Sequence, residues 1–183
     1  MVSFETEQVG PDTKQKEIFL DLVDRYGRAL RRLTQVYVQS AADQQDLFQE
    51  ILLAIWTALP RFRRESSERT WLYRIGHNVA LTHVIKIRQK ASRELPQDEQ
   101  VFAVPAKDNL ETGLIDRQNR RQLIEAIRVL PSLDQQILML HLEGLSYAEM
   151  EEVTGLSSSN VGVRLTRARR RLSEWMQKVE VKI

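Results

Sequence analysis

The sequence predicts an all-α protein made of two small helical domains that a flexible linker joins. Three observations predict this fold. Apolar residues recur at three- and four-residue steps over long segments, which is the spacing of one face of an α-helix. No segment shows the alternating pattern of a β-strand. Between the helical segments, "RELPQDEQVFAVPAKDNLE" at 93–111 holds two prolines and many acidic residues without a helical period, so we expect a linker over residues 93–115.

The composition narrows the possible classes of protein. With 42% hydrophobic and 28% charged residues, the 183-residue chain has the content of a globular protein. It contains no cysteine, which excludes disulfides, thiolate metal sites and cysteine nucleophiles and fits a reducing compartment. The N-terminal tail, residues 1–14, has no apolar signal-peptide core, and the longest apolar run, "ILLAIW" at 51–56, is too short for a membrane span. We therefore expect a soluble, cytoplasmic protein without membrane insertion.

Three helices are expected in the first domain, residues 15–92. Their approximate bounds are 14–38, 42–59 and 66–90, and Pro60 stops the second helix. This second helix is apolar on more than a single stripe: one face carries Leu47, Ile51 and Ile55, and another carries Phe48, Leu52 and Trp56. The second apolar face indicates a contact beyond ordinary core packing.

The second domain, residues 116–183, begins with two helices. Pro131 stops the first of them, at 116–130. Ser132 and Gln135 have the spacing of a capping box, which is expected to open the next helix, and Gly144 closes it.

A helix-turn-helix follows in the sequence. Ser146 and Glu149 form a second capping box that opens a short helix, and Gly155 ends this helix. A long basic helix begins after Ser157. A short helix, a tight turn and a longer basic helix are typical of the motif that places its second helix in the major groove of DNA.

The charge is concentrated in two blocks, although the net charge is only +2. Residues 61–93 contain nine basic and two acidic side chains, and residues 157–183 contain seven basic and two acidic ones. In "RFRRESSERTWLYRIG", at 61–76, five arginines alternate with aromatic residues. Two separate cationic blocks predict two contacts with a polyanion.

The last helix has an apolar stripe and an opposite face suited to DNA. At 100° per residue, one apolar stripe would dock on the preceding helices, made of Val161, Leu165, Ala168 and Leu172. Short hydrogen-bonding groups and arginines on the other side suit base edges and phosphates. The predicted DNA contacts are Ser157, Ser158, Ser159, Asn160, Val163, Arg164, Thr166, Arg167 and Arg170. The alternative is a solvated arginine-rich helix.

No catalytic constellation is found in the sequence. His77, His83 and His141 lack the spacing of metal ligands, and we expect His77 and His83 at the surface or facing DNA. A phosphate-binding glycine loop and a G-x-S-x-G nucleophile elbow are also missing. We therefore expect a protein that is not an enzyme, with no catalytic residue, cofactor, metal ion or small-molecule substrate.

Both halves of the chain resemble bacterial sigma factors of the extracytoplasmic-function (ECF) type. "LPSLDQQILMLHLEGLSYAEMEEVTGLSSSNVGVRLTRARRRL" resembles region 4 of that family. "DQQDLFQEILLAIWTALPRFR" and "ERTWLYRIGHNVALTH" resemble region 2. The likeness covers residues 15–91 and 116–176; Met150, Glu151, Gly162 and Thr82 depart from the usual pattern. It implies an alternative sigma factor that binds core RNA polymerase and directs promoter recognition, DNA melting and transcription initiation.

The resemblance implies that region 2 melts and holds the minus-ten promoter element. Aromatic faces replace lost base stacking, and arginines neutralise the exposed strand. The implied contacts are Phe62, Arg63, Arg64, Arg69, Trp71, Tyr73, Arg74, Asn78, Lys86 and Arg88. Trp71 can equally belong to the core, and Phe62 can equally anchor its loop.

The resemblance also implies protein partners. Acidic and amide groups on the helix at 42–59 do not favour DNA, and Asp46, Gln49 and Glu50 would bind the β′ clamp helices of core polymerase, with Leu47 and Leu53 as further contacts. Acids near a helix N-terminus also favour the helix dipole, which is the simpler explanation for Asp46. Region 4 would read the minus-thirty-five element and contact the β flap, and an anti-sigma factor is an expected inhibitor, often one held at the membrane.

Two other functions fit parts of the sequence. A helix-turn-helix regulator that binds duplex DNA without being a polymerase subunit would need a sensor domain, a ligand pocket or a dimer helix, and none is visible. A helical adaptor that binds only proteins would not need the two cationic blocks.

Overall fold

The computed structural model describes residues 11–94 and 114–180, and these residues form seven α-helices and one short 3-10 turn, without a strand among them. This agrees with the all-α prediction. The predicted linker, residues 93–115, lies mostly outside the described residues, and the first helix begins at Pro11, inside the predicted tail. Among the described helices, none combines the length and the apolar character that crossing a membrane requires.

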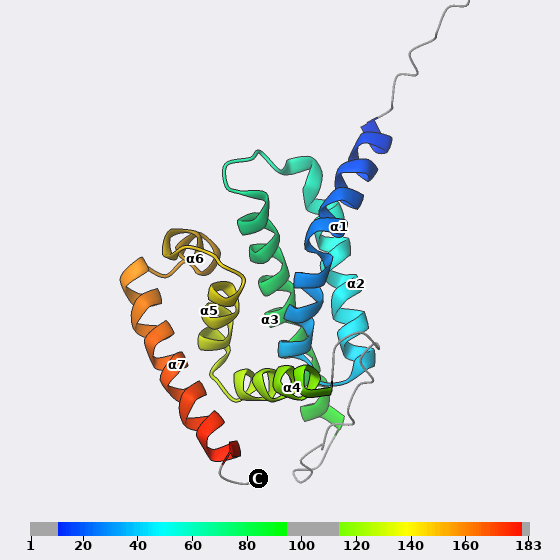
Figure 1. Ribbon diagram of the computed structural model, residues 1–183. Coiled ribbons are helices and arrows are strands. Elements are labelled where there is room, and N and C mark those ends of the chain that lie inside the picture. The colour runs from blue at the N-terminus through cyan, green and yellow to red at the C-terminus, as the bar shows by residue number, and fades with distance from the viewer. Residues whose placement is uncertain (1–10, 95–113, 181–183) are drawn as a thin grey trace, which may run out of the picture.

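Three long helices form the N-terminal domain: α1 (Pro11–Tyr37), α2 (Ala41–Ala58) and α3 (Glu68–Glu94), with the 3-10 turn η1 (Leu59–Arg61) after α2 (Figure 1). Ser40 caps α2 by accepting a hydrogen bond from the Asp43 backbone N–H at 3.0 Å. The shared core contains Leu30, Leu33 and Ile51, which are almost fully buried between the three helices.

The second apolar face of α2 is covered by α1, so the inference of an outside partner for it was wrong. The Trp56 ring meets Phe19 edge-on, with centroids 5.3 Å apart. The Arg31 guanidinium lies 4.0 Å from the centroid of the Phe48 ring. Both contacts come from α1, at positions twelve residues apart, so this one helix covers the face.

The C-terminal domain consists of α4 (Leu114–Arg128), α5 (Ser132–Leu142), α6 (Tyr147–Thr154) and α7 (Ser158–Glu180). Both bonds of the Ser146–Glu149 capping box are present. Gly155 ends α6 with a left-handed φ of 71°, a conformation that glycine adopts without strain. Of the predicted apolar stripe of α7, Val161, Leu165 and Ala168 are fully buried, and Leu172 is half-buried.

The capping box predicted for α5 does not form. Pro131 is the N-cap residue, and no side chain caps this helix. Gln135 instead donates a hydrogen bond to the Arg128 carbonyl oxygen at 2.7 Å. Only a short turn separates α4 from α5, so the Gln135 side chain reaches the last carbonyl groups of α4. It binds one of them instead of capping the start of α5.

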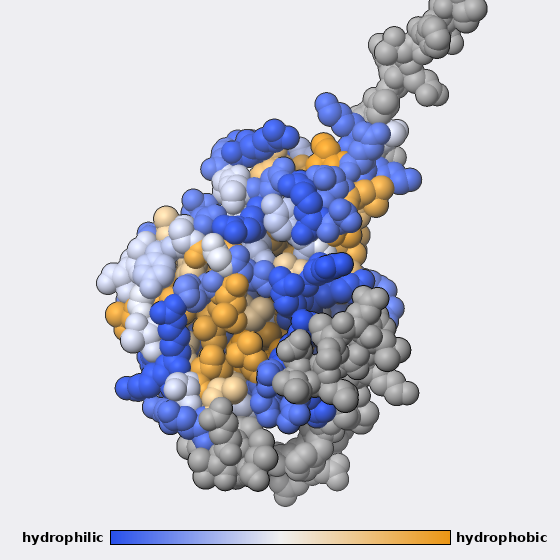
Figure 2. Space-filling view, viewed as in Figure 1, coloured by the Kyte–Doolittle hydropathy of each residue, from blue (hydrophilic) through white to orange (hydrophobic). Residues whose placement is uncertain are grey.

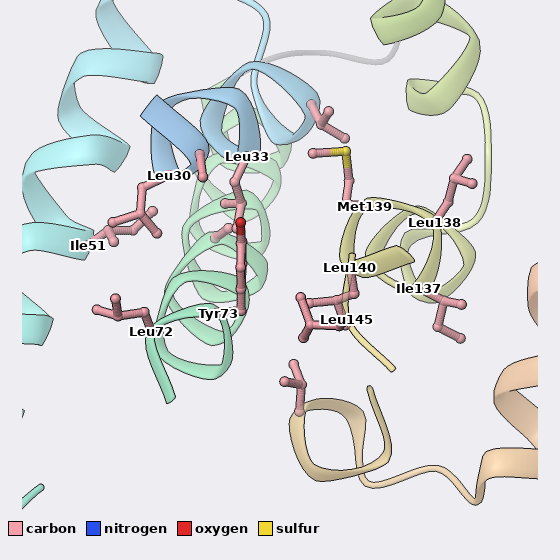
Figure 3. Packing of buried hydrophobic residues seen from close by; sticks show 14 of the residues in the cluster. Leu30, Leu33, Ile51, Leu72, Tyr73, Ile137, Leu138, Met139, Leu140 and Leu145 are labelled. Atoms are coloured by element: carbon pink, nitrogen blue, oxygen red, sulfur yellow. The ribbon is translucent and has the colours of Figure 1, made fainter. Parts of the chain in front are cut away.

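The two domains pack against each other, with α3 beside α5 and α6, and α1 beside α4. Figure 3 shows Leu33 and Tyr73 facing Met139 and Leu140 across this contact, and the buried residues of both domains form one cluster. Arg128 of α4 donates hydrogen bonds to the carbonyl oxygens of Gln35 and Val38 at the end of α1, both at 3.0 Å.

Charged groups surround this apolar contact. Arg32 of α1 makes a bidentate pair with Glu143, with both N–O distances at 2.8 Å. Arg69 of α3 lies 3.3 Å from the Glu149 carboxylate and donates to the Gly144 carbonyl oxygen at 3.2 Å. The domain interface therefore has an apolar centre and a rim of ion pairs.

Candidate nucleic-acid and polymerase interfaces

The loop that joins η1 to α3 forms a pocket of about 590 Å³. Its lining residues are Pro60, Arg61, Phe62, Arg63, Glu65, Ser66, Trp71 and Arg74. Arg64, at the turn of the loop, has a φ of 58°, a positive value unusual for a residue other than glycine. Cations from both the loop and α3 thus border one cavity.

Two aromatic rings line part of this pocket. Phe62 stacks on Trp71 with ring centroids 4.6 Å apart and an angle of 29° between the planes. Trp71 is buried and Phe62 is half-buried, while Arg61 and Arg63 are exposed. The pocket therefore combines an aromatic lining, in which Phe62 is the more accessible ring, with a cationic rim.

An exposed polar stripe continues along α3 from the pocket. Arg74, Asn78 and Lys86 are exposed at helical spacing, with Thr82 between them. Thr82 donates a hydrogen bond to the Asn78 carbonyl oxygen at 2.9 Å. The side chain of Arg88, also predicted to bind DNA, lies outside the described part of the chain.

Tyr73 and Arg69 face the C-terminal domain in this structure. Tyr73 is 3% exposed, and burial, reinforced by the nearby Glu143 carboxylate, raises its pKa above the ordinary value. Its hydroxyl therefore stays protonated. Arg69 is held by Glu149 and by backbone carbonyls. Two predicted DNA contacts are thus engaged across the domain interface.

His77 and His83 are buried, so the expectation that they lie at the surface or face DNA was wrong. His77 is fully buried, its Nδ1 is 2.8 Å from the Tyr37 hydroxyl oxygen, and burial lowers its pKa to about 3. His83 Nδ1 lies 3.1 Å from the Glu50 carboxylate. His77 follows Tyr73 by four residues, and this spacing was the available signal that both lie on the inward face of α3.

The polar side of α2 is only partly accessible. Asp46, Gln49 and Leu53 share one exposed face, with Leu53 66% exposed. Glu50 is half-buried beside His83. Leu47, also predicted to contact polymerase, is fully buried in the core and presents no side-chain surface.

The outer face of α7 carries the short polar groups that the sequence predicts. Ser157, Ser159, Asn160, Val163, Thr166 and Arg170 are exposed, and Ser158 is half-buried. Ser158 donates a hydrogen bond through its hydroxyl to Glu151 of α6 at 2.6 Å. Figure 2 shows hydrophilic residues along the outer edge of α7 and an apolar surface between α7 and α5.

Arg164 and Arg167 lie on the side of this face that adjoins α5, where both are partly exposed and pair with Asp134. Asp134 is 0% exposed, and its carboxylate accepts from Arg164 Nη1 at 2.8 Å and from Arg167 Nη2 at 3.1 Å. Arg171 Nη1 lies 3.9 Å away. Sequence reasoning missed Asp134, although arginines at i, i+3 and i+7 indicate a common partner on one helix face.

Comparison with known proteins identifies both domains. The model of Sigma-70 region 2 matches residues 22–90, and that of Sigma-70 region 4 matches residues 120–172. The ECF RNA polymerase sigma-E factor of Escherichia coli K12 is 30% identical over 188 residues, which cover 94% of this chain and 95% of that one. The sigma-E factor of Haemophilus influenzae is 30% identical over 169 residues, covering 88% and 89%.

Solved structures have the same fold. The sigma factor RpoE of Bartonella quintana, in complex with the anti-sigma factor NepR, has a TM-score of 0.73 at 22% identity, over 88% of this chain and 98% of that one. CnrH, in complex with the cytosolic domain of CnrY, has a TM-score of 0.65 at 24% identity, over 89% and 90%. With 30% identity to sigma-E factors over nearly the full length of both chains, this protein belongs to the ECF family of RNA polymerase sigma factors.

Proposed function

We propose that this alternative sigma factor traps the melted minus-ten strand in the pocket beside Phe62 and Trp71. The pocket carries the proposal because its aromatic lining and arginine rim meet both needs of an unpaired strand. An extruded base needs a ring to stack on, and its backbone needs cations. The volume of about 590 Å³ lies within the range of small-molecule sites. Arg74, Asn78 and Lys86 would then follow the strand along α3.

The C-terminal domain would read the duplex minus-thirty-five element with α7. Ser159, Asn160 and Val163 lie in the first turns of the helix, where a recognition helix meets base edges. Val163 can pack on a thymine methyl group, and Arg170 further along can contact phosphate. The same domain would contact the β flap of polymerase.

Core polymerase would bind the exposed face of α2. Asp46 and Gln49 supply polar contacts around Leu53, an apolar side chain that stands out in this polar setting. An apolar anchor with a polar surround is the usual arrangement of a binding hot spot. The β′ clamp helices are the partner that the family implies. The polymerase, rather than this chain, would supply the catalytic groups.

Binding to DNA through Tyr73 and Arg69 requires the domains to separate. Both residues contact the C-terminal domain here, so this arrangement would belong to the free or inhibited factor. One relative of the same fold is in complex with an anti-sigma factor, and we propose that a partner of this class also binds this chain. The factor would act in the cytoplasm, where it meets core polymerase and promoter DNA.

Run-off transcription with bacterial core polymerase on a library of random promoters tests the proposal. Transcripts that depend on this protein should share two spaced motifs upstream of their start sites. The variant Arg63→Ala should lose transcription from closed duplex and keep more of it on a template that is already unpaired at the minus-ten element. Binding of duplex DNA without any protein-dependent transcript would favour the alternative of a helix-turn-helix regulator.

A further inference from the structure

We propose that Asp134 is a positioning residue for sequence readout, because it holds Arg164 and Arg167 in the orientation in which they approach DNA. The inference rests on the proposed role of α7 as the reading helix. Asp134 itself is fully buried on α5 and would touch no nucleotide. Its effect would pass through the two guanidinium groups that it binds.

The two arginines bind the Asp134 carboxylate through different nitrogen atoms. Arg164 uses Nη1 on the carboxylate at 2.8 Å. Arg167 approaches side-on, with Nε at 3.3 Å and Nη2 at 3.1 Å. A two-point contact of a planar guanidinium fixes the plane as well as the position of the group. The side chain of Arg167 is thus restrained in its rotation before any DNA arrives.

Within the part of the chain that the structure describes, both arginines keep further donors for a second partner. A guanidinium has five N–H groups, and these contacts use one from Arg164 and two from Arg167. Arg164 is 31% and Arg167 is 40% exposed at the side chain, so the remaining donors can reach solvent or a base edge. The same group can therefore bind Asp134 and DNA together.

The charges do not cancel within this cluster. One carboxylate faces three guanidinium groups, since Arg171 also lies within 3.9 Å. The surplus of positive charge favours an external anion, and the DNA backbone beside the reading face supplies it. Asp134 thus orients the arginines without neutralising the surface.

Arg170 provides a contrast on the same helix. Its side chain is 73% exposed, and its ion pair is with Glu174, a neighbour on α7 that is itself exposed, at 3.6 Å. Such a pair restrains a side chain weakly. Arg170 suits a phosphate contact that is tolerant of sequence, whereas the arginines on Asp134 suit discrimination between bases.

The test measures specificity separately from affinity. Holoenzyme made from core polymerase and the full chain, wild type or Asp134→Asn, is titrated with the promoter that wild type selects from the random library and with a scrambled duplex. Asparagine keeps the shape of the side chain but removes its charge. We expect the ratio of specific to non-specific affinity to fall about tenfold, with binding to the scrambled duplex equal or tighter.

The control variant Glu125→Gln makes the same change in net charge at an exposed pair with Arg121 on α4 and should leave the ratio unchanged. An unchanged ratio in Asp134→Asn would overturn the inference, and so would an equal loss of both affinities, which indicates only a structural link between α5 and α7. A gain in both would show that Asp134 withholds the arginines from DNA and would also overturn it. If wild type selects no motif, the proposed function itself fails.

A second measurement needs no variant and so does not depend on its folding. Nitrogen relaxation of the arginine Nε–H groups in the wild-type chain reports side-chain order. Arg167 should be ordered to nearly the level of the backbone, and Arg170 should be mobile on the nanosecond timescale. Equal mobility of the two would overturn the positioning role.

Discussion

Two sets of arginine–carboxylate pairs occupy different places in this molecule. One lies within the C-terminal domain, where the fully buried Asp134 holds arginines of α7. The other crosses between the domains, where Arg32 and Arg69 meet Glu143 and Glu149 and the arginines are partly exposed. The first set persists in any arrangement of the domains, whereas the second exists only while they touch. The difference separates a role in orienting DNA contacts from a role in controlling access to them.

The largest effect on stability should come from removing the arginines that pair with the buried Asp134. In the double variant Arg164→Leu, Arg167→Leu, Arg171 is the one described cation left near Asp134, at 3.9 Å. A buried carboxylate without close partners costs about 3–5 kcal/mol, so we expect a loss of this size in the free energy of unfolding. Urea unfolding followed by circular dichroism measures it. Adding Asp134→Leu should restore much of the loss, and Arg170→Leu should change stability by less than about 0.5 kcal/mol. A double variant no less stable than Arg170→Leu would remove the distinction between the two sets.

The N-terminal domain buries a neutral side chain, His77, instead of an ion pair. Its burial should make the stability of the protein depend on pH. Burial lowers the pKa of His77 from 6.5 to about 3, so the unfolded chain binds a proton that the folded chain does not. Stability is therefore complete above pH 6.5 and is lost as the pH falls toward 3, by about 2 kcal/mol between pH 6.5 and pH 5. The variant His77→Gln should be less stable at pH 7 but should show a shallower slope over this interval. An equal slope in both proteins would contradict the assignment.

The exposed face of α2 should matter for partner binding and not for folding. Leu53→Asp should weaken binding to core polymerase about tenfold, because it places a charge at the centre of the proposed contact. Its free energy of unfolding should change by less than about 0.5 kcal/mol. Val129→Asp is a matched control, since Val129 has the same exposed fraction of 66% but lies in the other domain. Fluorescence anisotropy of labelled protein gives both affinities, and equal affinities would exclude Leu53 from the interface.

The smallest effect should come from the pairs between the domains. Glu143→Gln removes the charge that faces Arg32, and a pair of this kind contributes about 1 kcal/mol or less. This shifts the equilibrium toward separated domains by up to about fivefold, and added salt should shift wild type the same way. Energy transfer between dyes on α2 and α7 reports the separation. Glu125→Gln should behave as wild type; if Glu143→Gln does too, the ion pairs do not hold the domains together.

Local signals in the sequence predicted most of the fold. The apolar stripe of α7, the Ser146 capping box and Gly155 all act within one or two turns of helix, so their spacing was enough. The prediction of a capping box at Ser132 was wrong because Gln135 donates its hydrogen bond to a carbonyl oxygen of the preceding helix.

Contacts between distant segments escaped the sequence reasoning. Asp134 binds Arg164 and Arg167, which follow it in the sequence by 30 and 33 positions. Arg69 and Glu149 are 80 positions apart. Nothing in the local pattern of Tyr73 shows that another domain covers it. The same limit applies to the functional residues: composition located the cationic blocks, but only the fold shows which arginines already have partners.

Arg128 of the C-terminal domain donates hydrogen bonds to the end of α1, so separation of the domains should increase fraying of that helix end. Carbonyl groups in the last turn of a helix lack partners within the helix and favour a cation, and α1 has no basic residue of its own in that turn. Arg128 of the other domain fills this place at the Gln35 and Val38 oxygens. When the domains part, α1 loses the Arg128 donors, and the turn that leads into α2 keeps the Gln44 amide, which donates to the Val38 and Gln39 carbonyl oxygens at 3.2 and 3.1 Å. Separation of the domains should therefore lower the order of the last turn of α1. Faster amide hydrogen exchange at residues 35–40 would report that separation.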